Sequence, residues 1–351
     1  MISVTEKKNC CGCSACAQTC PQNCITMKRD ADGFLYPQVD DRCVECGRCE
    51  AVCPMLNNRV PERRPTAYGA INRNDDIRRM SSSGGVFYLL CDYVIRQNGV
   101  VFGAVFDADF NVVHTHAETL DDCKVFMGSK YVPSVIGDAY ERTKQFLTDD
   151  RTVLFTGTPC QIAGLYAYLG SMRDHEKLLT QDIVCHSVPA PVQWEAFLNA
   201  IRGDKTVKGI EFRNKETGWR SGSFVATFDD GSVYKELYSQ TDYMKGFLRG
   251  EYSRPSCYDC PFSRLERQSD LTLGDFWGVE GLYPKLYDNK GTSLVLVNSK
   301  KGKRVLKQIS GALTLKKVRL DYAVKYNPAA ANRGSMFFDQ KTGRIKGGCY
   351  E

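Results

Sequence analysis

The 351-residue sequence contains no run of the roughly 18–20 uninterrupted apolar residues that a membrane-spanning helix requires. Its longest apolar block, residues 86–95, is interrupted by Asp92 and predicts an amphipathic helix. The sequence begins MISVTEKK, which lacks the apolar core of a signal peptide. These absences predict a cytoplasmic protein without a membrane span.

A strong excess of one charge is also absent. The 47 basic and 41 acidic residues give a net charge of +6, which predicts a mildly basic surface. No basic run is interleaved with aromatic residues, so nucleic acid is not an expected partner. The sequence has neither a G-x-G-x-x-G motif nor a P-loop, which disfavours a Rossmann-type nicotinamide site.

Cysteine, in contrast, is abundant, with seventeen residues in the chain. Cytosolic thiols are kept reduced, so structural disulfides are not expected and metal ligation is the better interpretation. The run C-x2-C-x2-C-x3-C-P occurs twice near the N-terminus, formed by Cys10, Cys13, Cys16 and Cys20 and by Cys43, Cys46, Cys49 and Cys53. This run is typical of bacterial ferredoxins, in which the fourth cysteine of each run binds the other 4Fe-4S cluster.

The two runs predict two crossed ligand sets. The predicted sets are Cys10, Cys13, Cys16 and Cys53 for the first cluster and Cys43, Cys46, Cys49 and Cys20 for the second. A zinc module is the alternative, but zinc sites usually show two separated cysteine pairs. Cys11 breaks the ligand spacing and is interpreted as a free neighbour, whereas Cys24 is interpreted as a small buried hydrophobe.

Between the two runs, residues 25–28 and 34–37 predict short strands joined by a turn. Residues 57–65 contain two prolines and three arginines and predict a linker. We therefore predict one domain over residues 1–58 and a second over residues 66–351.

After residue 65, helical and strand patterns alternate, which favours a mixed α/β domain. Helices are predicted within residues 86–98, 136–147, 157–169 and 192–202 and from residue 301 onward. Strands are predicted at residues 100–106, 112–116, 152–155, 178–185 and 292–297 and near residue 313, with a hairpin over residues 224–234.

Further cysteines lie at the ends of these predicted elements: Cys160, Cys185, Cys257 and Cys260. The last two form a C-x2-C pair, which is compatible with a thiol–disulfide couple, half of a zinc site or part of a third cluster. Cys91, Cys123 and Cys349 lie in ordinary helical or terminal contexts and are interpreted as bystanders.

Four motifs of this region occur in an order that resembles a known family: GSKYVPS at residues 128–134, GTPCQ at 157–161, VCHSVP at 184–189 and SDLTLGDFWG at 269–278. Together they resemble the beta-subunit family of coenzyme F-420 hydrogenases and dehydrogenases, over nearly everything after residue 65. The N-terminal module is similar to that of stand-alone bacterial members. Ser187 departs from the glycine that relatives commonly carry.

The resemblance implies FAD and one more 4Fe-4S cluster, held by Cys160, Cys185, Cys257 and Cys260. A flavin accepts a hydride and releases electrons one at a time, which is what a link between clusters and a hydride donor requires. The fold class is therefore α+β: a bacterial-type dicluster ferredoxin domain followed by a mixed α/β flavin and iron–sulfur domain.

Several residues are candidates for the flavin site. Ser82, Ser83, Gly84 and Gly85 precede a helix and suit a diphosphate, although serine N-capping alone is the alternative. Lys130 and Tyr131 are the candidate catalytic residues beside the flavin ring, with a surface lysine and a core tyrosine as the alternative. Thr158 and Asp275 complete the candidate cofactor-binding set, and Asp275 alternatively caps a turn.

These observations predict an oxidoreductase that passes electrons between ferredoxin, or another redox protein, and an organic hydride donor or acceptor such as coenzyme F-420. Two alternatives stay open. One is an electron-transfer beta subunit of a larger hydrogenase or dehydrogenase complex, with no substrate of its own. The other is a chain in which only the N-terminal clusters are active and the remainder is a docking scaffold.

Overall fold

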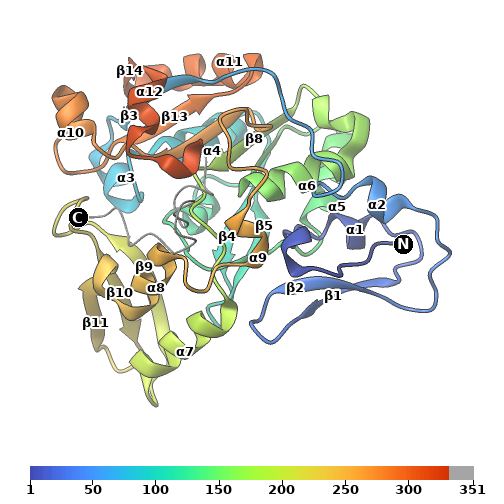
Figure 1. Cartoon of the computed structure of the whole chain (residues 1–351). Helices are drawn as coiled ribbons and strands as arrows, with labels where there is room; N and C mark the ends of the chain where they lie inside the picture. Colours follow the sequence, from blue (N-terminus) through green and yellow to red (C-terminus); the bar gives the residue numbers. More distant parts are fainter. Residues whose placement is uncertain (332–351) are drawn as a thin grey trace, which may run out of the picture.

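The computed structural model describes residues 1–331, and Cys349 therefore lies outside the described residues. The N-terminal module, residues 1–58, is a small unit at one side of the molecule (Figure 1). Its strands β1 (Ile25–Arg29) and β2 (Leu35–Val39) form an antiparallel hairpin. Its short helices η1 (Lys7–Asn9), α1 (Ala15–Gln18) and α2 (Arg48–Ala51) lie beside or within the cysteine runs. The predicted hairpin is confirmed.

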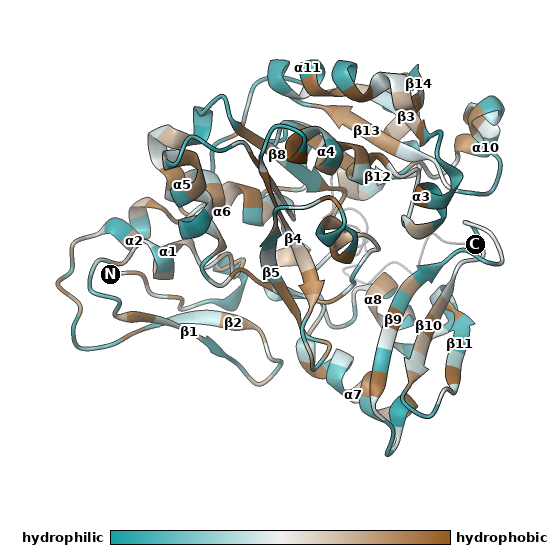
Figure 2. Ribbon diagram, turned by 180° about the vertical axis from the view of Figure 1, so that it is seen from behind, coloured by the Kyte–Doolittle hydropathy of each residue, from teal (hydrophilic) through white to brown (hydrophobic). Residues whose placement is uncertain are grey.

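A nine-stranded mixed sheet forms the centre of the remaining chain, in the order β14-β3-β13-β12-β8-β7-β4-β5-β6. Its strands are β3 (Thr66–Asn72), β4 (Val100–Phe106), β5 (Val112–Ala117), β6 (Ser134–Val135), β7 (Val153–Gly157), β8 (Leu178–Ile183), β12 (Leu271–Asp275), β13 (Ser293–Val297) and β14 (Leu313–Lys317). The neighbours β4, β7, β8 and β12 are parallel. Figure 2 shows a largely hydrophobic β13, as expected for a strand inside a covered sheet.

The helices after the module are α3 (Asp75–Met80), α4 (Val86–Ile95), α5 (Ala139–Thr148), α6 (Pro159–Leu169), α7 (Pro191–Arg202), α8 (Asp242–Arg249), α9 (Pro255–Tyr258), α10 (Val279–Leu282), α11 (Lys300–Ile309) and α12 (Leu320–Lys325). Helices α4 and α11 share one core with Val101, Leu154 and Leu179. Helices α5 and α6 share the other with Val100 and Phe155. Because neighbouring residues of a strand point to opposite faces, these cores cover the two faces of the sheet.

A second, three-stranded antiparallel sheet consists of β9 (Val207–Asn214), β10 (Ser223–Phe228) and β11 (Val233–Leu237). Helices α7 and α8 pack on it through an aromatic core that includes Trp194, Phe212 and Phe224. In Figure 2 this small sheet lies apart from the central sheet, on the same side of β4 as α7.

Most predicted elements are present, with shifted ends. The helix expected over residues 136–147 begins at Ala139, because Gly137 has a φ of +56° and residues 134–135 pair with β5. The strand expected over residues 178–185 ends at Ile183, which leaves Cys185 in the following loop. Among residues 1–331, no helix combines the length and apolar character that crossing a bilayer requires.

A buried ion pair links the end of β8 to the loop before β12. Arg267 Nη1 lies 3.6 Å from Asp182 Oδ2, and each side chain is 1% exposed. Burial raises the pKa of Asp182, against the opposing charge of Arg267. We predict that Arg267→Leu lowers the free energy of unfolding by about 3–5 kcal/mol, because it leaves a buried carboxylate unpaired. Anaerobic denaturant unfolding measures this change.

The matched control is Arg304→Leu, which removes the exposed pair with Glu176. We expect this variant to change the free energy of unfolding by no more than about 1 kcal/mol. An equal decrease in the free energy of unfolding in both variants would show that the buried pair contributes no more to stability than the exposed one.

Candidate functional site

A cavity of about 390 Å³ lies where parallel strands of the central sheet end, within the roughly 300–1,000 Å³ typical of ligand sites. It is lined by residues of the segments 81–87, 126–135, 156–161, 181–189 and 273–275 and by residues 11–12 and 33–35 of the N-terminal module. Strands β7, β8 and β12 all end at this wall. The carboxyl ends of parallel strands are the usual place for a ligand in an open α/β sheet.

The serine loop, residues 81–85, forms one side of the cavity between α3 and α4. Ser82 Oγ accepts a hydrogen bond of 2.6 Å from the backbone N–H of Ser129. Gly84 requires glycine, because a Cβ there would lie 2.4 Å from the carbonyl oxygen of Ala70. Gly85, with a φ of +81°, is the N-cap of α4 and no side chain caps that helix. The alternative that a serine caps α4 is therefore wrong.

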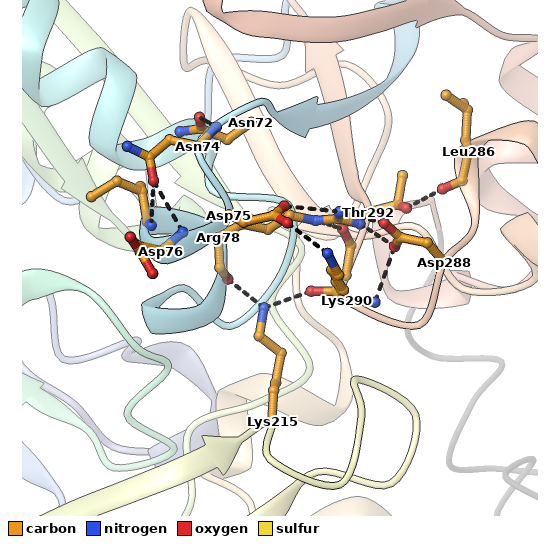
Figure 3. Close-up of polar contacts among 12 residues, drawn as sticks. Asn72, Asn74, Asp75, Asp76, Arg78, Lys215, Leu286, Asp288, Lys290 and Thr292 are labelled. Carbon is orange, nitrogen blue, oxygen red and sulfur yellow. Dashed lines mark hydrogen bonds and ion pairs between the residues drawn. The ribbon is translucent and has the colours of Figure 1, made fainter.

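A polar network ties the serine loop to the small sheet, and Figure 3 shows its part around Lys215, Arg78 and Asp288. Lys215, just after β9, donates from Nζ to the carbonyl oxygens of Arg78 at 2.6 Å, Ser83 at 3.0 Å and Lys290 at 2.8 Å. Burial, with a smaller effect of the Arg78 charge, lowers the pKa of Lys215 to about 7. Arg78 is itself buried and pairs with Asp288. Three carbonyl acceptors thus saturate one ammonium and fix the position of the loop.

Lys130 and Tyr131 both lie in the cavity wall. Lys130 is half-buried, and its Nζ donates to the carbonyl oxygens of Met127 at 3.1 Å and Gly128 at 3.2 Å. Burial lowers the pKa of Lys130 to about 8. Tyr131 packs against Phe212, and its hydroxyl accepts a hydrogen bond from Arg213 at 3.2 Å. The structure thus places Lys130 in a cavity rather than on an open surface.

Asp275 and Thr158 also lie in this wall. The carboxylate of Asp275 accepts from Arg213 Nη1 at 3.0 Å and from Trp219 Nε1 at 3.0 Å. Asp275 therefore joins β12 to the small sheet and does not merely cap a turn. The Thr158 hydroxyl lies 3.1 Å from the sulfur of Cys160 at the start of α6.

The candidate ligands of a third cluster come from two places, the cavity wall and helix α9. Cys160 and Cys185 line the cavity, whereas Cys257 is buried in α9 and Cys260 follows that helix. The loop that carries Cys185 is joined to the start of α9, which carries Cys257, because the N–H of Arg254 donates to the carbonyl oxygen of Val188 at 2.8 Å.

In the N-terminal module, thiols of the two cysteine runs lie near each other. Burial, together with the neighbouring thiols of Cys10 and Cys53, raises the pKa of Cys16 to about 12. Cys20 Sγ lies 3.4 Å from Cys24 Sγ, and Cys24 is buried as predicted. Within residues 1–331, no group of three or more His, Cys, Asp or Glu side chains is arranged to hold one metal ion. The ligands of a 4Fe-4S cluster are farther apart, because each thiolate binds a different iron.

Cys11, interpreted from its spacing as a free neighbour of the cluster ligands, is a free cysteine that contacts two other thiols. Its thiol makes hydrogen-bond contacts with those of Cys13 and Cys160, and the Cys13 contact contributes most to the raised pKa of Cys11. Helix α6 approaches the same turn closely, since a Cβ on Gly164 would lie 2.9 Å from Cys13 Cβ. The first cysteine run therefore packs directly against the segment that carries Cys160.

Comparisons with known proteins give matches for both parts of the chain. Residues 150–321 match the family described as the C terminus of the coenzyme F420 hydrogenase/dehydrogenase beta subunit, and residues 9–57 match the 4Fe-4S dicluster domain. A chain in the structure of the xenon-derivatised F420-reducing NiFe hydrogenase complex from Methanosarcina barkeri is similar, with a TM-score of 0.54 and 19% identity over 82% of this chain and 97% of that chain. At this identity the similarity shows a shared fold. No curated protein matches the sequence.

The N-terminal module is therefore a 4Fe-4S dicluster domain, which makes the chain an iron–sulfur electron-transfer protein. The match over residues 150–321, just under half of the chain, relates the second part of the chain to the coenzyme F420 hydrogenase/dehydrogenase beta subunit. The α+β fold expected from the resemblance is confirmed.

Three residues that contribute to the site escaped the sequence analysis. Lys215 and Arg213 lie at the end of a strand that no local pattern predicts, and their partners are distant in the chain. Arg254 precedes Cys257 by three residues, and this proximity to a candidate ligand is the one sequence signal that singles it out.

We predict that the amine of Lys130 becomes reactive at unusually low pH. Only the neutral amine is nucleophilic, so its acylation by a trace of acetic anhydride should reach half its maximum near pH 8, compared with about 10.4 for a free lysine side chain. Mass spectrometry of the apoprotein at a series of pH values measures this, with exposed Lys208 as internal reference. If acylation of Lys130 instead reached half its maximum near the pH expected for a free lysine, the amine would not be desolvated in the cavity.

Proposed function

We propose that the chain is a flavin- and iron–sulfur-dependent oxidoreductase with FAD in the cavity and a third 4Fe-4S cluster beside it. One observation carries the proposal: the same cavity wall contains the serine loop, Lys130, Cys160 and Cys185, and is reached by Cys11 of the dicluster domain. The domain boundaries that accompany this proposal are residues 1–58 and 66–351.

The cavity residues suit a flavin dinucleotide. Ser82, Ser83, Gly84 and Gly85 bring hydroxyl and backbone N–H groups to the uncapped start of α4, where the helix dipole favours a diphosphate. The Lys130 ammonium, positioned by two carbonyl oxygens, would add positive charge to the wall. Bound FAD would supply the conversion between a hydride and single electrons. Tyr131 and Asp275, both fixed by Arg213, would bound the cavity on the side of the small sheet.

The third cluster would use Cys160, Cys185, Cys257 and Cys260. The backbone hydrogen bond between the loop of Cys185 and the residue before α9, the helix of Cys257, supports this set, as does the placement of Cys160 and Cys185 in one wall. Thr158, whose hydroxyl lies beside the Cys160 sulfur, would donate a hydrogen bond to that ligand.

The packing of the dicluster domain indicates the order of the clusters. Cys46 of the second run is exposed, as is its neighbour Val44. Cys13 of the first run packs instead against α5 and α6, and Cys11 contacts Cys160. The second N-terminal cluster would therefore meet ferredoxin or another redox protein, and the first would exchange electrons with the third cluster.

Coenzyme F-420 is the hydride donor or acceptor that the family suggests, and another organic substrate is compatible with the same cavity. The alternative function is an electron-transfer subunit without its own substrate. The similarity to a chain of a hydrogenase complex favours that alternative, whereas a formed cavity that adjoins Lys130 favours the enzyme.

The proposed path is tested by Cys257→Ala. Loss of one thiolate should destabilise the third cluster, so reduction of a one-electron acceptor through the dicluster domain should fall by more than the roughly 10–100-fold cost of losing a group that merely supports a ligand. Flavin reduction by the hydride donor should persist, because that step needs only the flavin and the donor. Stopped-flow traces of flavin bleaching and acceptor reduction, with reduced coenzyme F-420 tried before nicotinamides, measure both steps.

Cys123→Ala is the matched control, because Cys123 is buried in the core shared with α4, where it contacts Cys91. It should leave both steps near the wild-type rates. Wild-type acceptor reduction in a folded Cys257→Ala protein would show that the third cluster is absent or lies off the path.

A further inference from the structure

Arg254 lies at the contact between the dicluster domain and the rest of the chain. Its side chain crosses to the first cysteine run, where Nε donates to the carbonyl oxygen of Cys10 at 2.8 Å. Nη2 donates to the carbonyl oxygen of Leu35 at 2.9 Å and lies 3.6 Å from Cys10 Sγ. The guanidinium also lies over the ring of Tyr36, 4.3 Å from its centroid. One side chain thus binds both the backbone and the sulfur of a predicted cluster ligand.

This guanidinium is a buried charge without a carboxylate partner. Arg254 is 3% exposed, and no carboxylate among residues 1–331 lies within ion-pair distance of it; the other buried arginines Arg78, Arg213 and Arg267 each have one. A buried charge is strongly unfavourable unless an opposite charge compensates it. The thiol of Cys10, which Arg254 contacts directly, can do so as a thiolate once it binds iron; the thiol of Cys160 also lies within electrostatic reach of Arg254.

The surroundings hold Arg254 in this position from both sides. Gly12, with a φ of +72°, leaves room for it, because a Cβ there would lie 2.9 Å from Arg254 Nη1. On the other side, the Arg254 carbonyl oxygen accepts from the N–H of Cys257 at 2.8 Å, and its own N–H is bonded to Val188. The charge is therefore fixed between the first cysteine run, the loop of Cys185 and the start of α9, which carries Cys257.

We propose that Arg254 is a positioning and electrostatic residue that raises the reduction potential of the first N-terminal cluster. Reduction adds one electron to the cube and releases no group, so the negative charge beside Cys10 increases by one. A fixed guanidinium bonded to the ligand sulfur stabilises the more negative state, and hydrogen bonds and net charge are established determinants of cluster potential. The inference requires the dicluster domain and Cys10 as a ligand, but neither FAD nor the third cluster.

The test is a reductive titration of the anaerobically reconstituted full chain, followed by electron paramagnetic resonance. In Arg254→Gln, the ratio of reduced to oxidised first cluster at a fixed potential should fall about tenfold, which is a downward shift of about 59 mV for one electron. Arg254→Lys keeps the charge but cannot make the same three contacts, so its shift should have the same direction and a smaller size. Arg42→Gln, at an exposed arginine paired with Asp40 near the second run, should leave the first cluster unchanged.

The iron content of Arg254→Gln decides whether the potential of this variant or that of Arg254→Lys tests the proposal. If Arg254→Gln loads iron fully, an unchanged potential of every cluster overturns the proposal. If that variant loses iron from the first cluster, Arg254→Lys decides: a lowered potential supports the proposal, and an unchanged one overturns it. Either outcome is independent of flavin content, so a failure here does not bear on the proposed function.

Discussion

The close contact between the first cysteine run and helix α6 is the constraint on which the proposed electron path depends. Gly164 of α6 makes this contact possible, because a side chain there would collide with Cys13. Gly12 has the same role in the neighbouring contact of the run, because a side chain there would collide with Arg254. The contact with α6 also brings Cys11 against Cys160. Without it, the dicluster domain would be a separate ferredoxin on a linker, and electrons would have to cross a gap between two independently moving units.

A second constraint shapes the cavity from the opposite side. Asp275 and Lys215 each join the small three-stranded sheet to the central sheet, through Arg213 and through the carbonyl oxygens around the serine loop. These contacts are buried or partly buried, so they are shielded from the screening that weakens surface pairs. They position the candidate flavin residues before any ligand arrives, which reduces the ordering cost of binding.

Local patterns were sufficient to predict the cysteine runs, the hairpin and strands such as β4, because ligand spacing and apolar runs are properties of neighbouring residues. Strand β3 escaped prediction because all its residues are buried or half-buried, so that polar and apolar residues do not separate onto two faces. The contacts of Arg254 with Cys10 and of Lys215 with Ser83 join residues 244 and 132 positions apart. Local sequence patterns do not report such contacts, which is why the sequence predicts candidate site residues but not the groups that hold them.

The account is tested most directly by quantifying iron, acid-labile sulfide and flavin in protein purified and reconstituted without oxygen. Three cubes and one flavin predict about twelve irons, about twelve sulfides and about one FAD per chain. Saturation near eight irons would remove the third cluster, and flavin-free protein that binds no added FAD would remove the proposed hydride chemistry. Stoichiometric zinc in place of iron would contradict the assignment of the N-terminal cysteines to 4Fe-4S clusters.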